Sequence, residues 1–203
     1  LARAGFGADA GTDGDAPPTL FTGVSMDHVR GARLDPVVAY ATVGLSNPAT
    51  LPMEAGGGSA AAAGSTGAET AGAAEPRDAT AGPELRPDPG TVNLIVGTTR
   101  RLAPGAAANL VAVAAEAKAA TLLATAGILG TTSDAVVVGD DPDGEPAAFS
   151  GSATAVGGAA RACVRDAVRA GLRSRYPDGD VPGPTADAEH GVVTDERAEV
   201  FDP

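Results

Sequence analysis

Residues 54–89 divide the chain into two blocks, because this stretch carries almost no side chains that can form a hydrophobic core. It consists of alanine, glycine, proline, serine, threonine and acidic residues with two arginines, and Leu85 is its only large aliphatic residue. Such a composition cannot bury enough apolar surface to offset the conformational entropy that ordering would cost. We therefore expect a disordered low-complexity insertion within one domain.

The domain itself is expected to span residues 19–176, interrupted by the insertion at 54–89. Residues 1–18 are polar and rich in turn formers, and we expect a flexible N-terminal remnant there. Residues 177–203 form an acidic tail rich in proline and glycine, which we expect to be disordered, although a few apolar side chains could dock weakly: Val192, Val193, Val200 and Phe201. The two blocks together hold roughly 120 residues, a common size for a single domain.

Short runs of β-branched residues predict strands over residues 20–24, 37–45, 91–97 and 135–138. Pro104 occupies a favourable first-turn position for a long helix that continues to about Ala126. A second helix is predicted over residues 156–175 and ends before Pro177, and residues 139–146 (GDDPDGEP) are expected to form a turn. This order predicts an α/β (or α+β) fold, with a mixed β-sheet and two long helices packed on it.

The composition excludes several classes of function. Acidic residues number 26 against 14 lysines and arginines, and the net charge of -12 argues against a nucleic-acid-binding surface. Cys163 is the only cysteine, and His28 and His190 are the only histidines, so a multi-cysteine or histidine-rich metal site is not expected. We find no apolar run long enough to predict a membrane span and no signal peptide, and we expect a cytoplasmic protein without nucleic-acid or membrane partners. The acid excess favours a salt-rich cytoplasm.

The first predicted helix is expected to be buried nearly all round, because alanine, valine and leucine dominate it. At 100° per residue, Asn109 and Glu116 share one side of this helix, and Lys118 points the opposite way. A carboxylate on a buried helix is either a hydrogen-bonded structural acid or a desolvated general base. The spacing alone favours the structural alternative.

Polar residues at the ends of predicted strands are further candidates. The connection from Gly130 to Asp134 (GTTSD) supplies hydroxyls and backbone N–H groups that can hold a carbonyl oxygen or an anion, although a plain helix-to-strand turn is the simpler alternative. Asn47 and Asn93 end or interrupt apolar runs. A side-chain amide can bind another amide through its C=O and N–H groups, but either asparagine could instead bond a turn.

Four arginines recur at every fourth position of the second predicted helix: Arg161, Arg165, Arg169 and Arg173. This arginine stripe could bind an anion or a partner. We prefer the expectation that these arginines form a solvated face and that the excess acidic residues of the protein balance their charge.

Three sets of residues, taken in order, resemble the adenosylcobinamide amidohydrolases of archaeal corrinoid salvage. They are residues 90–93 (GTVN), Asn109 with residues 116–118 (EAK), and the turn at 130–134, and residues 39–48 and 151–172 fit the salt-adapted members. The resemblance covers most of residues 21–176 outside the insertion. The family usually has threonine in place of Ser133. Members also carry a further N-terminal segment with a Gly-rich turn, and residues 1–6 look like the end of the helix that follows it, so we expect this chain to be a fragment.

The resemblance implies hydrolysis of the amide that joins the aminopropanol arm to the corrin ring of adenosylcobinamide, giving adenosylcobyric acid for coenzyme B12 salvage. The alternative is a non-catalytic corrinoid-binding or regulatory module. No cofactor is expected, because cobalt enters only as part of the corrinoid substrate. No protein-bound metal is expected either, although a carboxylate-bound Mg²⁺ stays open. The sequence predicts no particular oligomeric state.

This activity assigns roles to the candidate residues. Amide hydrolysis needs an activated water, stabilisation of the developing oxyanion and protonation of the leaving amine. We assign catalysis to Glu116 as the general base, with Asp134 as the next candidate. The predicted substrate-binding residues are Asn47, Asn93, Asn109, Lys118, Thr131, Thr132 and Ser133.

Overall fold

The computed structural model describes residues 20–53, 90–183 and 191–202 of the chain. The predicted insertion at 54–89 and the predicted N-terminal remnant at 1–18 lie outside the described residues, as does part of the predicted tail. A short 3₁₀ helix, Met26–His28, precedes the first strand.

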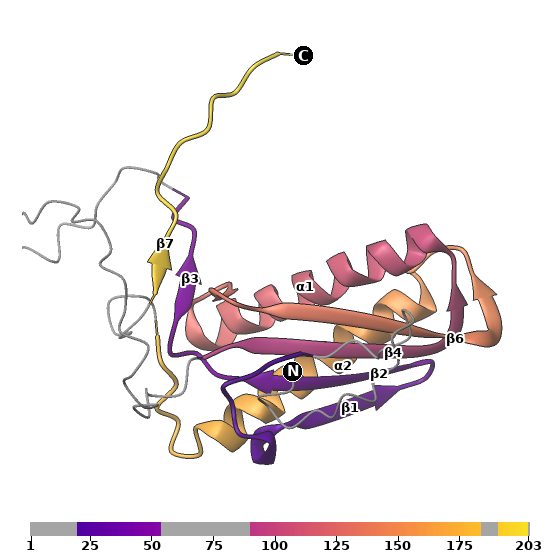
Figure 1. The fold of residues 1–203 in the computed structure, drawn as a ribbon, viewed down its shortest axis with the longest axis horizontal. Coiled ribbons are helices and arrows are strands. Elements are labelled where there is room, and N and C mark those ends of the chain that lie inside the picture. The colour runs from indigo at the N-terminus through magenta and orange to yellow at the C-terminus, as the bar shows by residue number, and fades with distance from the viewer. Residues whose placement is uncertain (1–19, 54–89, 184–190, 203) are drawn as a thin grey trace, which may run out of the picture.

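Four strands form the main sheet, in the order β1-β2-β4-β6 (Figure 1). β2 (Val37–Val43) is antiparallel to both of its neighbours, β1 (Arg30–Leu34) and β4 (Val92–Leu102), whereas β4 and β6 (Ala135–Ala147) are parallel. Parallel strands need a crossover connection, and α1 (Pro104–Ala126) supplies it. The predicted mixed sheet is therefore confirmed.

A small second sheet lies beside the start of β4 and joins segments that are far apart in the sequence (Figure 1). β3 (Pro48–Thr50) is antiparallel to β5 (Gly130–Thr131) and parallel to β7 (Val192–Val193). These pairings place the connection that follows α1 next to the segment that follows β2. The second sheet thereby brings Asn47 close to Thr132.

Both long helices cover one face of the main sheet (Figure 1). α1 begins at Pro104 and ends at Gly127, which adopts the left-handed conformation with φ 69. α2 (Ala155–Arg175) begins at a Thr154 cap, whose hydroxyl accepts a hydrogen bond from Gly157 N at 3.0 Å. Alternate residues of the central strands pack against the helices in one core: Val37, Ala39, Ala41, Val43, Val92, Leu94 and Val96. Both predicted helices are confirmed.

One side of α1 is exposed to solvent, which corrects the expectation of a helix buried nearly all round. Its buried residues follow a single side: Ala106, Leu110, Val113, Ala114, Ala117, Thr121 and Leu122. On the back of the helix, Leu123 is 55% exposed. By length and composition alone α1 could cross a membrane, contrary to the sequence-based expectation that no run reaches that length. In the described fold the buried side of α1 packs against α2, β6 and β4.

Residues 20–24 do not form the predicted strand. The carbonyl oxygen of Phe21 accepts a hydrogen bond from the side chain of Asn93 at 2.7 Å. A side-chain contact therefore satisfies this backbone group, and no strand ladder is needed.

Residues 139–146, expected to be a turn, belong to β6. They continue alongside β4 through a register shift between Thr98 and Arg100. Gly144 permits this close approach, because a Cβ there would lie 2.2 Å from the carbonyl oxygen of Thr99. Strand pairing thus overrides the local turn propensity, and the edge position of β6 accommodates its prolines.

Candidate active site

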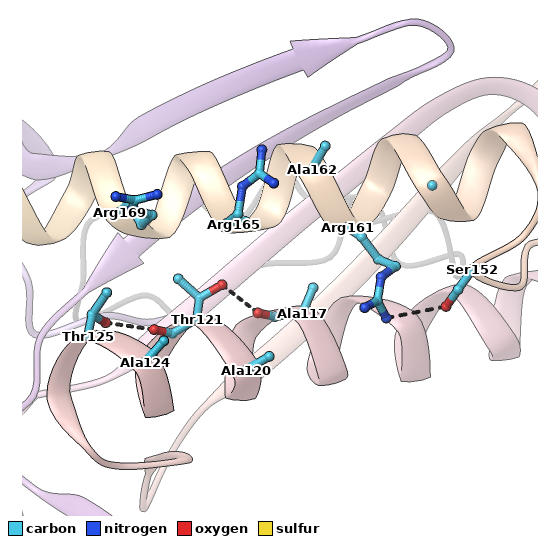
Figure 2. Close-up of a pocket in the computed structure, with 11 residues that line it drawn as sticks. Ala117, Ala120, Thr121, Ala124, Thr125, Ser152, Arg161, Ala162, Arg165 and Arg169 are labelled. Atoms are coloured by element: carbon cyan, nitrogen blue, oxygen red, sulfur yellow. Dashed lines mark hydrogen bonds between the residues drawn. The ribbon is translucent and has the colours of Figure 1, made fainter.

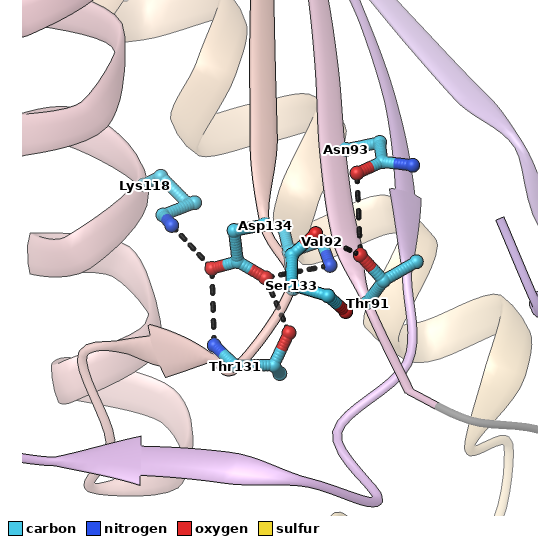
Figure 3. Close-up of polar contacts among 7 residues, drawn as sticks. All are labelled: Thr91, Val92, Asn93, Lys118, Thr131, Ser133 and Asp134. Atoms are coloured by element: carbon cyan, nitrogen blue, oxygen red, sulfur yellow. Dashed lines mark hydrogen bonds and ion pairs between the residues drawn. The ribbon is translucent and has the colours of Figure 1, made fainter. Parts of the chain in front are cut away.

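Asp134 is the centre of a polar cluster at the start of β6 (Figure 3). Its Oδ1 accepts hydrogen bonds from Val92 N at 2.9 Å and from the Thr131 hydroxyl. Its Oδ2 accepts from Thr131 N at 3.0 Å and forms an ion pair with Lys118. The side chain of Asp134 is only 10% exposed, and these donors satisfy a carboxylate that burial would otherwise destabilise.

Lys118 reaches this cluster from α1, and its side chain is 11% exposed. It lies on the opposite side of α1 from Glu116, as the spacing predicts, and its ion pair is with Asp134. Gly130 makes room for this pair, because a Cβ there would lie 3.0 Å from Lys118 Nζ and 2.5 Å from Asp134 Oδ2. The sole lysine of the chain is therefore held by a buried carboxylate.

A second set of hydrogen bonds extends from the cluster along β4 (Figure 3). The hydroxyl of Thr91 lies 3.0 Å from the carbonyl oxygen of Ser133 and 3.2 Å from Asn93 Oδ1. Asn93 is 6% exposed and donates from Nδ2 to Phe21. Ser133 joins through its backbone, while the residue itself is exposed.

Two hydrogen bonds join Asn47 and Thr132. The side-chain amide of Asn47 donates to the Thr132 hydroxyl, and Thr132 N donates to the Asn47 carbonyl oxygen at 3.1 Å. Asn47 Oδ1 is buried, and no described residue donates to it. This oxygen is an available acceptor beside the cluster.

Glu116 and Asn109 do not join the cluster. They share one side of α1, as predicted, but that side faces the start of α2. Glu116 Oε2 lies 3.5 Å from Arg161 Nη1, and Asn109 Oδ1 lies 3.5 Å from Ser150 Oγ. The Glu116 side chain is 65% exposed, so the expected desolvation of this acid is wrong. Alanines make the exposed side of α1 apolar, and hydropathy therefore does not reveal which side faces water.

A groove of about 620 Å³ lies between α1 and α2, which also pack against each other (Figure 2). Arginines of the stripe line its α2 side, and Arg161 donates to Ser152 Oγ at 3.3 Å. Arg165 pairs with Asp166 at 2.8 Å, and this hydrogen bond lowers the pKa of Asp166 and raises the pKa of Arg165. Arg161, Arg165 and Arg169 are exposed, as the solvated-face expectation requires.

Two further observations concern metal and thiol chemistry. Within residues 20–53, 90–183 and 191–202, no group of three histidine, cysteine, aspartate or glutamate side chains is placed to hold a metal ion. Cys163 is buried in the core, and burial raises the pKa of its thiol.

Sequence reasoning missed Thr91, which links Asn93 to Ser133. The spacing could have identified Thr91, because residues two positions apart on a strand, such as Thr91 and Asn93, face the same side of the sheet. It also missed the backbone groups of Val92 and Phe21, for which the side-chain pattern offers no signal.

The fold and the cluster define a single-domain α/β protein with a buried polar cluster at the start of β6. Seven of the nine predicted site residues gather at this site: Asn47, Asn93, Lys118, Thr131, Thr132, Ser133 and Asp134.

The family model for adenosylcobinamide amidohydrolase matches residues 3–179. A protein of Halobacterium salinarum named adenosylcobinamide amidohydrolase is 53% identical over 203 residues, which cover 100% of this chain and 76% of that protein. No solved structure matches the chain. The chain therefore belongs to the adenosylcobinamide amidohydrolase family, and the predicted resemblance is confirmed.

Proposed function

We propose that this chain hydrolyses the amide that joins the aminopropanol arm to the corrin ring of adenosylcobinamide. The products are adenosylcobyric acid and aminopropanol. Family membership and the name of the Halobacterium relative support this activity. The structural observation that supports it is the buried Asp134–Lys118 pair, around which hydroxyl groups and side-chain amides meet.

In this proposal the chemistry belongs to the cluster around Asp134 and not to Glu116. The Asp134 carboxylate contacts both the Thr131 hydroxyl and the Lys118 ammonium. A proton can pass between the carboxylate and a bound substrate through either neighbour, as the activation of water and the protonation of the leaving amine require. The Lys118 ammonium, in a poorly hydrated site, stabilises the developing oxyanion.

Asn47 and Asn93 hold the substrate amide. The unbonded Oδ1 of Asn47 accepts an amide N–H, which relieves the cost of a buried acceptor without a partner. The exposed side chains of Thr132 and Ser133 add hydroxyl donors at the same turn. Asn109 and Glu116 lie near the start of α2, 3.5 Å from Ser150 Oγ and Arg161 Nη1 respectively, and this proposal gives them no part in the chemistry.

The test is incubation of the purified protein with adenosylcobinamide in concentrated KCl, followed by separation of the corrinoid products. We expect a corrinoid with one new carboxylate, formed in the presence of a chelator as well, because we propose that no protein-bound metal or other cofactor is required. Substrate that is bound but left uncut would favour a corrinoid-binding module. Activity that is lost on chelation and restored by one divalent ion would contradict the proposal on the metal. We place this reaction in the cytoplasm, without nucleic-acid or membrane partners.

A further inference from the structure

The face of the main sheet that lies away from both helices is apolar at its centre. Tyr40, Ile95 and Val137 stand side by side on β2, β4 and β6. Tyr40 is 46% exposed and Ile95 is 47% exposed. A sheet that faces water on one side normally carries polar residues there, and a contiguous exposed apolar surface marks a binding site.

The neighbouring row on this face contains two glycines whose presence the fold does not explain. Gly97 on β4 and Gly139 on β6 are direct partners in the strand register. Neither has a positive φ; among the described glycines only Gly127 and Gly179 do. A Cβ at Gly139 would meet nothing within 4 Å, and a Cβ at Gly97 would meet only Val38 at 3.4 Å.

Neither backbone conformation nor crowding therefore requires glycine at these two positions, although glycine weakens a strand. Gly31, on the edge strand β1, differs in this respect, because a Cβ there would lie 3.0 Å from the ring of Tyr40. A strand glycine often marks a bulge, a bend or a place that a ligand or another backbone approaches closely. The register shift of β4 and β6 lies beyond Thr98, outside this glycine pair, so we take the two glycines to mark a close approach.

This face borders the candidate active site. Thr42, Asn93 and Ala135 form the row on the other side of Ile95, and Asn93 belongs to the polar cluster. Residues 20–22 lie against Thr42 and Asn93, which hydrogen-bond to the Thr22 hydroxyl and to the Phe21 carbonyl oxygen, so the exposed part of the face begins at Ile95. Asn93 and Gly97 are four strand residues apart, which is about 13 Å at the rise of a β-strand. A hollow of about 490 Å³ lies at the Gly97 end, where Arg33 and Val38 line it.

We propose that this face seats the flat corrin macrocycle of the substrate; its residues are Val38, Tyr40, Ile95, Gly97, Val137 and Gly139. The inference rests on the proposed function, because a ring joined to the scissile amide must lie within reach of Asn93. The two glycines have no side chains, so the ring can approach the backbone of the strands closely. The apolar side chains pack against the ring, and Tyr40 adds an aromatic contact. Arg33 lies where it can donate to the carbonyl groups of the amide arms.

The test is the substitution Gly139→Val. Valine favours a strand, and a Cβ at position 139 meets nothing within 4 Å, so we expect the variant to be at least as stable as the parent, but its side chain stands where the ring must lie. We expect the affinity for cobyric acid, which keeps the macrocycle and lacks the scissile amide, to fall about tenfold or more, the cost of a misfit of one side chain. Equilibrium dialysis measures this affinity without any need for turnover.

Gly105→Val is the matched control. Gly105 lies on α1, on the other side of the sheet, and a Cβ there also meets nothing within 4 Å. We expect unchanged corrinoid affinity for this variant. Three results would overturn the inference. Gly139→Val could bind cobyric acid as tightly as the parent does, both variants could lose affinity equally, or the parent could fail to bind cobyric acid. A parent dimer that Gly139→Val makes monomeric, with unchanged corrinoid affinity, would assign the face to a second copy. A parent that binds cobyric acid but leaves adenosylcobinamide uncut contradicts the proposed function and not this inference.

Discussion

Glu116 and Lys118 lie on opposite sides of α1, and each pairs with a residue of another segment: Glu116 with Arg161 and Lys118 with Asp134. The opposite placement of Glu116 and Lys118 on α1 was predictable, because helix geometry alone fixes it. The partner of each was not, because Asp134 and Arg161 come from other elements. The exposure of Glu116 was unpredictable for the same reason: it depends on which side of α1 packs on the sheet.

Lys118→Met is expected to lower the free energy of unfolding by about 3 kcal/mol, because it leaves the largely buried carboxylate of Asp134 without its cation. Urea unfolding in concentrated KCl measures the loss. Arg173→Met is the control, since this arginine is exposed on α2 and its removal should change stability little. An unchanged unfolding midpoint for Lys118→Met would show that the ion pair does not contribute to the fold.

Cys163 is expected to be inert toward a thiol reagent such as Ellman's reagent until the protein unfolds, because it is buried. Burial raises the pKa of its thiol, so at alkaline pH the unfolded chain releases this proton before the folded protein does. The contribution of Cys163 to stability is therefore constant below the ordinary thiol pKa and decreases as the pH rises above it. Rapid labelling of the native protein would contradict the buried position.

At the scale of elements, both helices were predictable because their ends carry local signals, Pro104 at the start of α1 and Pro177 after α2. The short strands β3, β5 and β7 were not, because two or three residues show no periodicity and pair only through distant partners. The end of β6 was not predictable either, because GDDPDGEP has the composition of a turn and forms a strand only through its pairing with β4. Thus the layers of the fold could be derived, but not the edge strand β1, where no strand was predicted, nor the second sheet beside the candidate site.

Thr154→Ala is expected to destabilise the protein by about 1 kcal/mol, because it removes the hydroxyl that accepts from Gly157 N at the start of α2. Thr154→Ser keeps that hydroxyl and should retain most of the stability. Thermal unfolding of the two variants and the parent compares them directly. Equal melting temperatures for all three would show that the cap does not contribute.

The whole molecule is strongly acidic, a composition that favours a salt-rich cytoplasm. Its net charge is -12, with 26 acidic residues against 14 lysines and arginines. Salt screens the repulsion among the acidic residues, which otherwise destabilises the compact state. We therefore expect the melting temperature to rise between low and multimolar KCl. A melting temperature that stays level or falls over this range would contradict a salt-adapted fold.

The most direct test of the catalytic assignment compares Asp134→Asn with Glu116→Gln in the adenosylcobinamide assay. Each change removes one negative charge and nearly preserves the shape of the side chain, so unfolding curves can establish that both variants fold. Loss of a general acid–base group costs roughly 100-fold to 10,000-fold in turnover. We expect a loss of that size for Asp134→Asn and a turnover near the parental value for Glu116→Gln. A folded Asp134→Asn variant with parental turnover, beside a Glu116→Gln variant that is inactive, would place the chemistry at the start of α2 and contradict the account.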